Sequence, residues 1–160
     1  MAAEIVVGID ESPSGRAALR WAAAYARSAG ARLRAIHVLA WPETRDAFAG
    51  PVVYDYLYPD ADQLDDSLTV GNRRLFEQVG PEPSWTLQFG QGHPGQVLVD
   101  ESRGADLLVV GTREHRGVGR LLFGSVGHYC INRATCPVVA VPAEPPTGHD
   151  APTPVLQEAR

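Results

Sequence analysis

Two spacings of hydrophobic residues alternate along the chain. Short continuous apolar runs, typical of strands buried on both faces, are separated by segments in which apolar residues recur every three or four positions, as in an amphipathic helix. The predicted strands are residues 4–9, 33–39, 85–89, 107–110 and 138–141, and the predicted helices are residues 13–29, 64–79 and two segments that begin at Pro94 and Ser125. This alternation predicts an α/β fold, a single doubly wound five-stranded parallel sheet with helices on both faces.

Capping residues mark the ends of two of these helices. Ser12 followed by Pro13 is a typical helix start, because the serine accepts a hydrogen bond from the first turn and the proline needs no donor there. Gly30 is suited to end the same helix, since glycine readily adopts the left-handed conformation of a C-terminal cap. We expect Gly104 to stop the helix that begins at Pro94.

The first helix carries two large aromatic residues. Trp21 and Tyr25 are four positions apart and share helical spacing with Ala18, Ala22 and Ala29. Residues at this spacing lie on one face of a helix, and an apolar face normally packs on the sheet. The pattern therefore predicts that both aromatic side chains belong to the core rather than to a binding site.

Two segments lack a regular pattern. Residues 40–62 contain several prolines and the tyrosines Tyr54, Tyr56 and Tyr58, and a loop of this length is often functional in a compact domain. It is either a lid over a site or a surface flap that packs on the domain or on a partner. Residues 1–142 form the predicted domain, and residues 143–160 form a Pro-rich tail that we expect to be extended, without chemistry of its own.

Composition excludes several classes of function. The net charge is -5 and no basic stripe is visible, which argues against a nucleic-acid-binding protein. All 14 basic residues are Arg, so a Walker-type phosphate loop, which requires lysine, is excluded. The sequence has no signal peptide and no apolar segment of membrane-spanning length, and its two cysteines form no disulfide framework. These features predict a cytoplasmic protein that binds no membrane.

Motifs for catalysis and metal binding are absent. Neither a dinucleotide fingerprint nor a nucleophile elbow fits the glycines between residues 111 and 127. His128, Cys130 and Cys136 match no zinc spacing and lack a fourth ligand. We therefore assign no catalytic residue and no metal ligand from the sequence.

The segment between the last two predicted strands has the features of an anion site. Gly124 and Ser125 begin a helix, where free backbone N–H groups and the helix dipole favour negative charge. Arg113, Arg116 and Arg120 precede this helix, and their forked donors match phosphate oxygens. A phosphate group is therefore the expected ligand of this loop.

These residues carry a family resemblance. Gly111, Glu114, Gly124 and Ser125 have the spacing of the G-x2-G-x9-G-[S/T] signature of the universal stress protein family, and the resemblance covers residues 3–142. It implies the adenine nucleotide alpha hydrolase-like fold with strand order 3-2-1-4-5. By the same resemblance, the residues that would contact an adenine nucleotide are Ile9, Asp10, Val38, Gly111, Thr112, Glu114, Gly124, Ser125 and Val126.

Two of these positions have an alternative interpretation. Asp10 follows the first strand and is either a ligand contact or a turn aspartate that caps nearby backbone N–H groups. Glu114 replaces the second glycine of the signature. Two like charges about 4 Å apart repel each other by about 4 kcal/mol at an effective dielectric constant of about 20. Either an arginine holds this carboxylate aside, or ATP binds weakly.

The resemblance implies a regulatory or sensing module of the stress response that binds ATP or another adenine nucleotide, such as AMP or cyclic AMP, with Mg2+ as a candidate companion. One alternative is a nucleotide-free dimer that acts through contacts with an unidentified protein, and another is a slow ATPase. Residues 138–141 form an apolar edge strand without lysine, which predicts a homodimer through antiparallel pairing of this strand.

Overall fold

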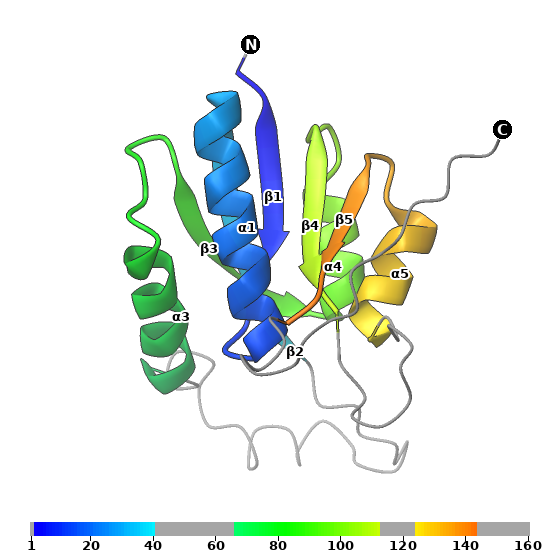
Figure 1. The fold of residues 1–160 in the computed structure, drawn as a ribbon. Helices are drawn as coiled ribbons and strands as arrows, with labels where there is room; N and C mark the ends of the chain where they lie inside the picture. The colour runs from blue at the N-terminus through cyan, green and yellow to red at the C-terminus, as the bar shows by residue number, and fades with distance from the viewer. Residues whose placement is uncertain (1, 41–65, 113–123, 144–160) are drawn as a thin grey trace, which may run out of the picture.

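The computed structural model describes residues 2–40, 66–112 and 124–143. Within these ranges five strands alternate with four helices (Figure 1). The elements are β1 (Glu4–Gly8), α1 (Pro13–Ala29), β2 (Arg32–Ala40), α3 (Asp66–Gln78), β3 (Thr86–Gly92), α4 (Pro94–Glu101), β4 (Leu107–Gly111), α5 (Ser125–Arg133) and β5 (Val138–Val141). Outside the described residues lie the predicted loop after residue 40, the tail from residue 144, and Arg113, Glu114, Arg116 and Arg120.

β1 is the central strand of a parallel sheet with the order β3-β2-β1-β4-β5. Val7 of β1 pairs with Ala35 of β2 and with Val109 of β4, and all three residues are fully buried. The predicted doubly wound sheet and its strand order are therefore confirmed. Because the winding direction reverses between β1 and β4, the carboxyl ends of these two strands form the switch point at which such sheets bind ligands.

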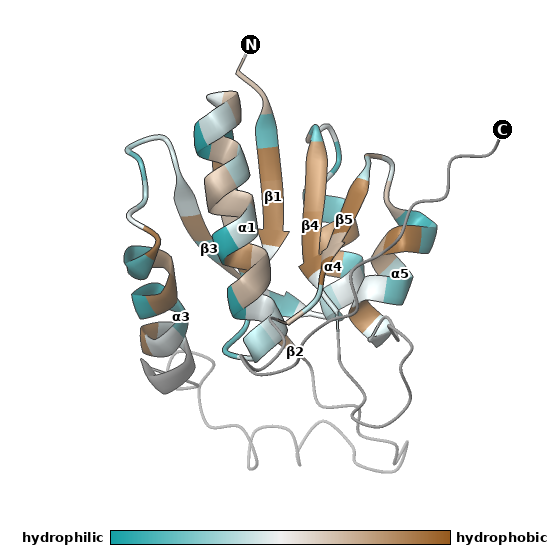
Figure 2. Cartoon of the chain, viewed as in Figure 1, coloured by the Kyte–Doolittle hydropathy of each residue, from teal (hydrophilic) through white to brown (hydrophobic). Residues whose placement is uncertain are grey.

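Helices cover both faces of this sheet (Figure 1). α1 and α3 lie on one face, and α4 and α5 lie on the other. Side chains alternate across a strand, so Val7 joins the buried cluster under α1 whereas Val6 joins the cluster under α4 and α5. Figure 2 shows the strands as the most hydrophobic part of the chain. No described helix is both long and apolar enough to cross a membrane.

α1 begins and ends as its sequence predicts. The Ser12 hydroxyl accepts a hydrogen bond from the Gly15 N–H at 3.1 Å, and Pro13 occupies the first helical position. At the other end Gly30 adopts the left-handed conformation, with φ 60°. Both capping predictions are confirmed, and the N-terminal cap fixes where the chain enters α1 from the end of β1.

Arg27 connects α1 to the end of α3. Its guanidinium donates hydrogen bonds to the carbonyl oxygens of Val79 and Gly80, the second at 2.6 Å. The same group lies 4.8 Å from the centroid of the Trp85 ring. The last carbonyl groups of a helix have no partner within it, so Arg27 supplies donors that the C-terminus of α3 requires.

The prediction that Trp21 and Tyr25 lie in the core is wrong. These residues are 37% and 46% exposed, and their rings stack on each other with centroids 5.2 Å apart. The buried face of α1 is made mainly of alanines, among them the stripe Ala18, Ala22 and Ala26. Alanine allows the helix to lie close to the sheet, and each aromatic residue, one position before an alanine of the stripe, falls on the flank of the helix.

The end of α4 also differs from the prediction. The helix ends at Glu101, with Ser102 as its cap, before Gly104 is reached. The buried Ser102 hydroxyl donates to the Val99 carbonyl at 3.0 Å, and the Ala105 N–H donates to the Ser102 carbonyl at 3.0 Å. This tight turn, in which Gly104 has φ 81°, leads directly into β4.

Gly111, the last residue of β4, lies against the first turn of α1. A Cβ atom at this position would lie 2.7 Å from the carbonyl carbon of Ser14 and 3.0 Å from the nitrogen of Gly15. Backbone atoms cannot rotate away from such a contact as a side chain can. Only glycine therefore allows β4 and α1 to approach this closely.

We expect Gly111→Ala to lower the free energy of unfolding by roughly 1–3 kcal/mol, because the added methyl group forces the α1 backbone to move. Gly8→Ala is the matched control, since its Cβ would meet only the flexible Leu98 side chain, 2.6 Å away at Cδ1. Thermal and denaturant unfolding followed by circular dichroism measure both variants. Equal losses in the two variants would contradict the role of Gly111.

Candidate functional site

The carboxyl ends of β1 and β4 lie close to one level of the sheet, and β2 continues past this level to Ala40. In the register of β1, Gly8 pairs with Ile36 of β2 and Val7 with Val109 of β4. Continued by two or three residues, this register brings Asp10 to the level of Val38 on one side and of Thr112 on the other. Three predicted site residues from distant parts of the sequence are therefore collected at the switch point.

Asp10 is held by the turn that leads from β1 into α1. Its Oδ1 accepts hydrogen bonds from the Ser12 N–H, at 3.0 Å, and from the Ser12 hydroxyl. Gly15 makes room for this carboxylate, because a Cβ atom there would lie 2.1 Å from Oδ1. The contact expected of a turn aspartate is thus present, and the residue remains exposed at the edge of the sheet.

Thr112 follows β4 and is 2% exposed. Its N–H donates to the Val141 carbonyl at 2.9 Å, which continues the pairing of β4 with β5. The Oγ1 atom is buried and makes no hydrogen bond to any described residue. A buried hydroxyl without a partner is unfavourable by about 1–3 kcal/mol, so this atom is suited to a ligand group or a water molecule.

The N-terminus of α5 has no capping side chain. Gly124 is the N-terminal cap and has no side chain to satisfy the N–H groups of the first turn, and no acidic residue lies in that turn. Ser125 is exposed, whereas Val126 is half-buried. The N–H groups of the first turn have no partner within the helix itself, and together with the helix dipole they favour an anion at this position.

The apolar residues of the predicted site divide between the two faces of the sheet. Val38 and Val126 both pack against the buried cluster under α4 and α5. Ile9 belongs to the opposite cluster, under α1. Val38 and Val126 therefore lie on the same face of the sheet, whereas the Ile9 side chain is part of the core on the other face.

Sequence reasoning missed His37, whose side chain forms a hydrogen bond with the backbone of Ile9. The His37 Nδ1 atom lies 3.0 Å from the Ile9 carbonyl oxygen, and this oxygen can only accept, so Nδ1 donates. The other ring nitrogen, Nε2, is buried and has no hydrogen-bond partner within the described part of the chain. The only sequence signal was a polar residue inside an apolar strand, a pattern that also fits a histidine with a purely structural role.

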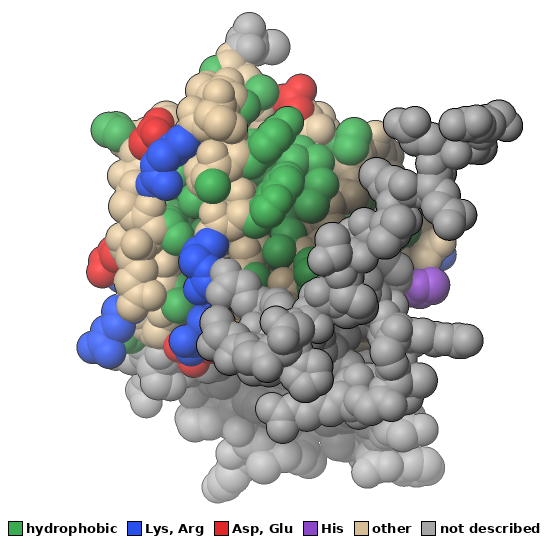
Figure 3. Space-filling model, in the orientation of Figure 1, with side chains coloured by type: hydrophobic (Ala, Val, Ile, Leu, Met, Phe, Trp, Pro, Cys, Tyr) green, Lys and Arg blue, Asp and Glu red, His purple; other side chains and the backbone are tan. Residues whose placement is uncertain are grey.

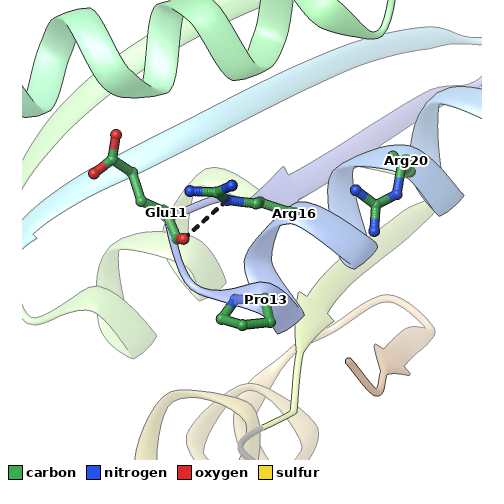
Figure 4. A pocket seen from close by; sticks show the side chains of 4 residues that line it. All are labelled: Glu11, Pro13, Arg16 and Arg20. Atoms are coloured by element: carbon green, nitrogen blue, oxygen red, sulfur yellow. Dashed lines mark hydrogen bonds between the residues drawn. The ribbon is translucent and has the colours of Figure 1, made fainter. Parts of the chain in front are cut away.

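A hollow of about 380 Å3 lies beside the turn that holds Asp10 (Figure 4). It is lined by Glu11, Pro13, Arg16 and Arg20. The Arg16 Nε–H donates to the Glu11 carbonyl oxygen at 3.0 Å, which orients this guanidinium over the first turn of α1. None of these four residues was predicted as a ligand contact, although two arginines one helical turn apart are a visible signal.

The described cysteine and histidine residues do not form a metal site. No group of three or more His, Cys, Asp or Glu side chains suited to a metal ion occurs in residues 2–40, 66–112 and 124–143. Cys130 is fully buried, and its burial, with a smaller effect of Cys136, raises the pKa of its thiol to about 11. This thiol is therefore protonated at neutral pH, which makes it a poor nucleophile and metal ligand.

Comparisons with known proteins identify the same family along the chain. Residues 1–142 match the model of the universal stress protein family. A universal stress protein of Mycolicibacterium smegmatis is 30% identical over 159 residues, which are 95% of this chain and 52% of that protein. A universal stress protein of Mycobacterium tuberculosis is 34% identical over 142 residues, which are 86% of this chain and 46% of that protein. The chain thus spans about half the length of these relatives.

Solved structures share the fold. UspA of Lactobacillus plantarum has a TM-score of 0.64 at 22% identity, covering 87% of this chain and 97% of its own. A universal stress protein in complex with cAMP has a TM-score of 0.57 at 24% identity, covering 87% and 95%. A family member from Arabidopsis thaliana with bound AMP has a TM-score of 0.56 at 19% identity, covering 89% and 92%. By its family match over residues 1–142, this chain belongs to the universal stress protein family.

Proposed function

We propose that this chain is a cytoplasmic regulatory or sensing module of the stress response that binds an adenine nucleotide at the carboxyl ends of β1 and β4. Two proteins with the same fold were solved with cAMP and with AMP. The site residues available here are compatible with such a ligand. The edge offers an exposed carboxylate, a buried hydroxyl and a helix N-terminus without a side-chain cap, from Asp10, Thr112 and Gly124 respectively.

The observation that carries this proposal concerns Thr112, at the end of the strand that precedes α5. Its buried Oγ1 atom has no hydrogen-bond partner among the described residues. A ribose or phosphate oxygen at this position would satisfy the buried hydroxyl. The phosphates would then extend to the first turn of α5, where the N–H groups of Ser125 and Val126 point outward from the helix start. Asp10, the exposed carboxylate at this edge, would meet the nucleoside or share a Mg2+ ion with the phosphates.

Glu114 favours a second candidate, a nucleotide-free protein that acts through contacts with other proteins. This residue stands where the family signature has a glycine, and its carboxylate is a like charge for any phosphate. Stabilisation by a helix terminus supplies only about 0.3–2 kcal/mol, less than the repulsion of about 4 kcal/mol from a carboxylate 4 Å away. This repulsion would weaken the binding of a nucleoside or a nucleoside monophosphate less than the binding of ATP. Comparing ligands that carry different numbers of phosphates therefore distinguishes the two candidates.

We also propose that the protein is a homodimer formed through β5. This strand is the last of the sheet, so one of its edges has no partner strand among the described elements. Val138, Val139 and Ala140 are half-buried and apolar, and no lysine protects the edge. Antiparallel pairing of two copies of β5 would satisfy its free backbone groups and is self-complementary, as a closed dimer requires.

The first test is ligand-dependent stability. ATP, ADP, AMP or cAMP should raise the melting temperature, because a ligand at one hundred times its Kd adds about 2.7 kcal/mol to the free energy of unfolding. Gly124→Asp should abolish the shift, since it puts a negative charge at the start of α5. Differential scanning fluorimetry measures both. Flat curves for all four ligands at millimolar concentration would reject nucleotide binding, and a full shift in the variant would move the anion site away from α5.

The second test compares ATP with adenosine in Glu114→Gly. Removing a carboxylate that faces the phosphates should strengthen ATP binding, by as much as about a thousandfold at close range, and leave adenosine binding unchanged. Isothermal titration calorimetry gives both affinities in the wild type and the variant. An equal ATP affinity in the two proteins would mean that Glu114 points away from the ligand.

The third test is the oligomeric state of Val139→Lys. A charge at the centre of β5 should convert the dimer into a monomer, because pairing would bring two lysines of the two copies close together. Light scattering measures the mass, and a melting curve verifies that the variant is folded. A folded variant that stays dimeric would place the interface elsewhere.

A further inference from the structure

Both backbone groups of Ile9, the residue before Asp10, form hydrogen bonds with β2. The Ile9 N–H donates to the Ile36 carbonyl oxygen at 2.9 Å, and the Ile9 carbonyl oxygen lies 3.0 Å from His37 Nδ1, which donates to it. β1 itself ends at Gly8, so the His37 side chain extends the contact between the two strands beyond the end of β1. The peptide group that joins Ile9 to Asp10 is therefore fixed to β2.

The His37 ring is itself held in place. His37 is 8% exposed, and its ring packs edge-on against Phe89, its register partner on β3, with centroids 6.1 Å apart and planes at 71°. On α3, the Arg73 guanidinium lies 6.0 Å from the centroid of the same Phe89 ring. Side chains in a closely packed interior have little freedom to rotate, so Nδ1 stays directed at the Ile9 carbonyl.

The hydrogen bonds that Asp10 and Glu11 accept in the turn into α1 are exposed. The Ser12 N–H and hydroxyl donate to Asp10 Oδ1, and the Arg16 Nε–H donates to the Glu11 carbonyl oxygen. Figure 3 shows basic and acidic side chains together on the surface near the start of α1. Water competes with exposed hydrogen bonds, whereas a hydrogen bond in the low-dielectric interior is stronger. The bond from His37 is therefore a buried anchor for this otherwise exposed turn.

The two carboxylate oxygens of Asp10 differ in their surroundings. Oδ1 accepts from Ser12, and a Cβ atom at Gly15 would lie 2.1 Å from Oδ1, so this oxygen packs tightly against the start of α1. No described residue donates a hydrogen bond to Oδ2. The direction of Oδ2 depends on the backbone of Asp10, which follows directly on the peptide group that His37 holds.

The second ring nitrogen indicates that His37 does more than fill space in the core. Nε2 is buried and has no hydrogen-bond partner among the described residues. Such an unsatisfied nitrogen is unfavourable, and a leucine of similar volume would avoid this cost. What a histidine adds at this position is the donor for the Ile9 carbonyl.

We propose that His37 is a positioning residue of the nucleotide site, which directs the Asp10 carboxylate toward the ligand through the carbonyl group of Ile9. This role rests on the proposed nucleotide binding, and it adds a residue that the family signature does not include. His37 is buried and acts through Asp10 without touching the ligand. Its loss should therefore weaken binding only while the Asp10 carboxylate is present.

The first part of the test separates the donor of His37 from its volume. The amide nitrogen of asparagine lies at nearly the same place along the side chain as Nδ1 and can donate to Ile9, whereas leucine cannot donate. We expect His37→Leu to weaken the binding of AMP by about tenfold, the effect of one lost hydrogen bond to a buried group. His37→Asn should bind AMP several times more tightly than His37→Leu. Isothermal titration calorimetry measures both, and circular dichroism verifies that they fold.

The second part is a double-mutant cycle with Asp10→Asn. An asparagine at position 10 can still accept from Ser12, but it replaces the other carboxylate oxygen with an amide nitrogen. In this background His37→Leu should weaken AMP binding by less than about twofold, because residues that act through one another are not additive. A tenfold loss in both backgrounds would mean that His37 acts independently of Asp10, which would overturn the proposal.

The third part needs no ligand. The amide N–H of Ser12 donates to Asp10 Oδ1, so its signal in a 1H–15N NMR spectrum reports the position of this carboxylate. The signal should move or broaden in His37→Leu and stay closer to its wild-type position in His37→Asn. An unmoved signal in His37→Leu would show that Asp10 keeps its place without the histidine, and would overturn the proposal.

The matched control is Leu33→Val. Leu33 lies on β2 in the same buried cluster as Ala35, near the other end of the strand, and pairs with Ile5. The loss of one buried methylene lowers stability without reaching Asp10, so AMP binding should stay within about threefold of the wild type. An equal loss of affinity in the control and in His37→Leu would mean that stability alone governs binding, and would overturn the proposal.

The failure of this proposal can be distinguished from the failure of nucleotide binding. If the wild type binds AMP and His37→Leu binds it equally well, His37 has no positioning role, although the nucleotide site stands. A wild type that binds no AMP, and whose melting curve no adenine nucleotide shifts, would reject the nucleotide site and with it the role of His37 there. The Ser12 signal would then still show whether His37 orders the Asp10 carboxylate.

Discussion

The close contact between Gly111 and the first turn of α1 is the constraint on which the rest of the structure depends. β4 is the only strand between β1 and β5, and its last residue touches the backbone of Ser14 and Gly15. This contact sets the height of α1 above the sheet. It also sets the position of Asp10, whose carboxylate occupies the space that the missing side chain of Gly15 leaves open. The close packing at Gly111 therefore positions both the core helix α1 and the candidate site.

The alanine stripe of α1 allows the helix to stay equally close to the sheet beyond its first turn. A helix that approaches closely at its N-terminus must stay close along its length, and Ala18, Ala22 and Ala26 allow this. The arginine side chains and the two aromatic rings of α1 lie outside this stripe, and Arg27 reaches the end of α3. The requirement for small residues at the contact with the sheet thus accounts for the exposure of Trp21 and Tyr25.

Much of the fold could be predicted from the sequence because strongly periodic segments and capping residues carry local information. The strand order came from a family resemblance rather than from periodicity, and the structure confirms it. The position of Trp21 and Tyr25 could not be predicted, because helical spacing shows which residues share a face but not which face touches the sheet. That choice depends on the volume available at the contact. The end of α4 was missed because a buried serine hydroxyl ended the helix before the glycine.

The candidate site was predictable only in part. Residues that follow apolar strands, such as Asp10 and Thr112, could be located from the sequence, since parallel strands end at one edge of a sheet. His37 could not, because its role depends on the Ile9 carbonyl of the neighbouring strand. Local sequence patterns do not predict contacts between strands that are far apart in the sequence.

The hydrogen bond from the Thr112 N–H to the Val141 carbonyl has a thermodynamic consequence. It joins the strand end that faces the proposed ligand to the strand that faces the proposed second copy. If a ligand orders Thr112, it also orders the end of β5, and the two binding events become linked. Such linkage is reciprocal: the factor by which nucleotide strengthens self-association equals the factor by which self-association strengthens nucleotide binding. If both proposals hold, the protein would report the nucleotide concentration as a change in its own assembly.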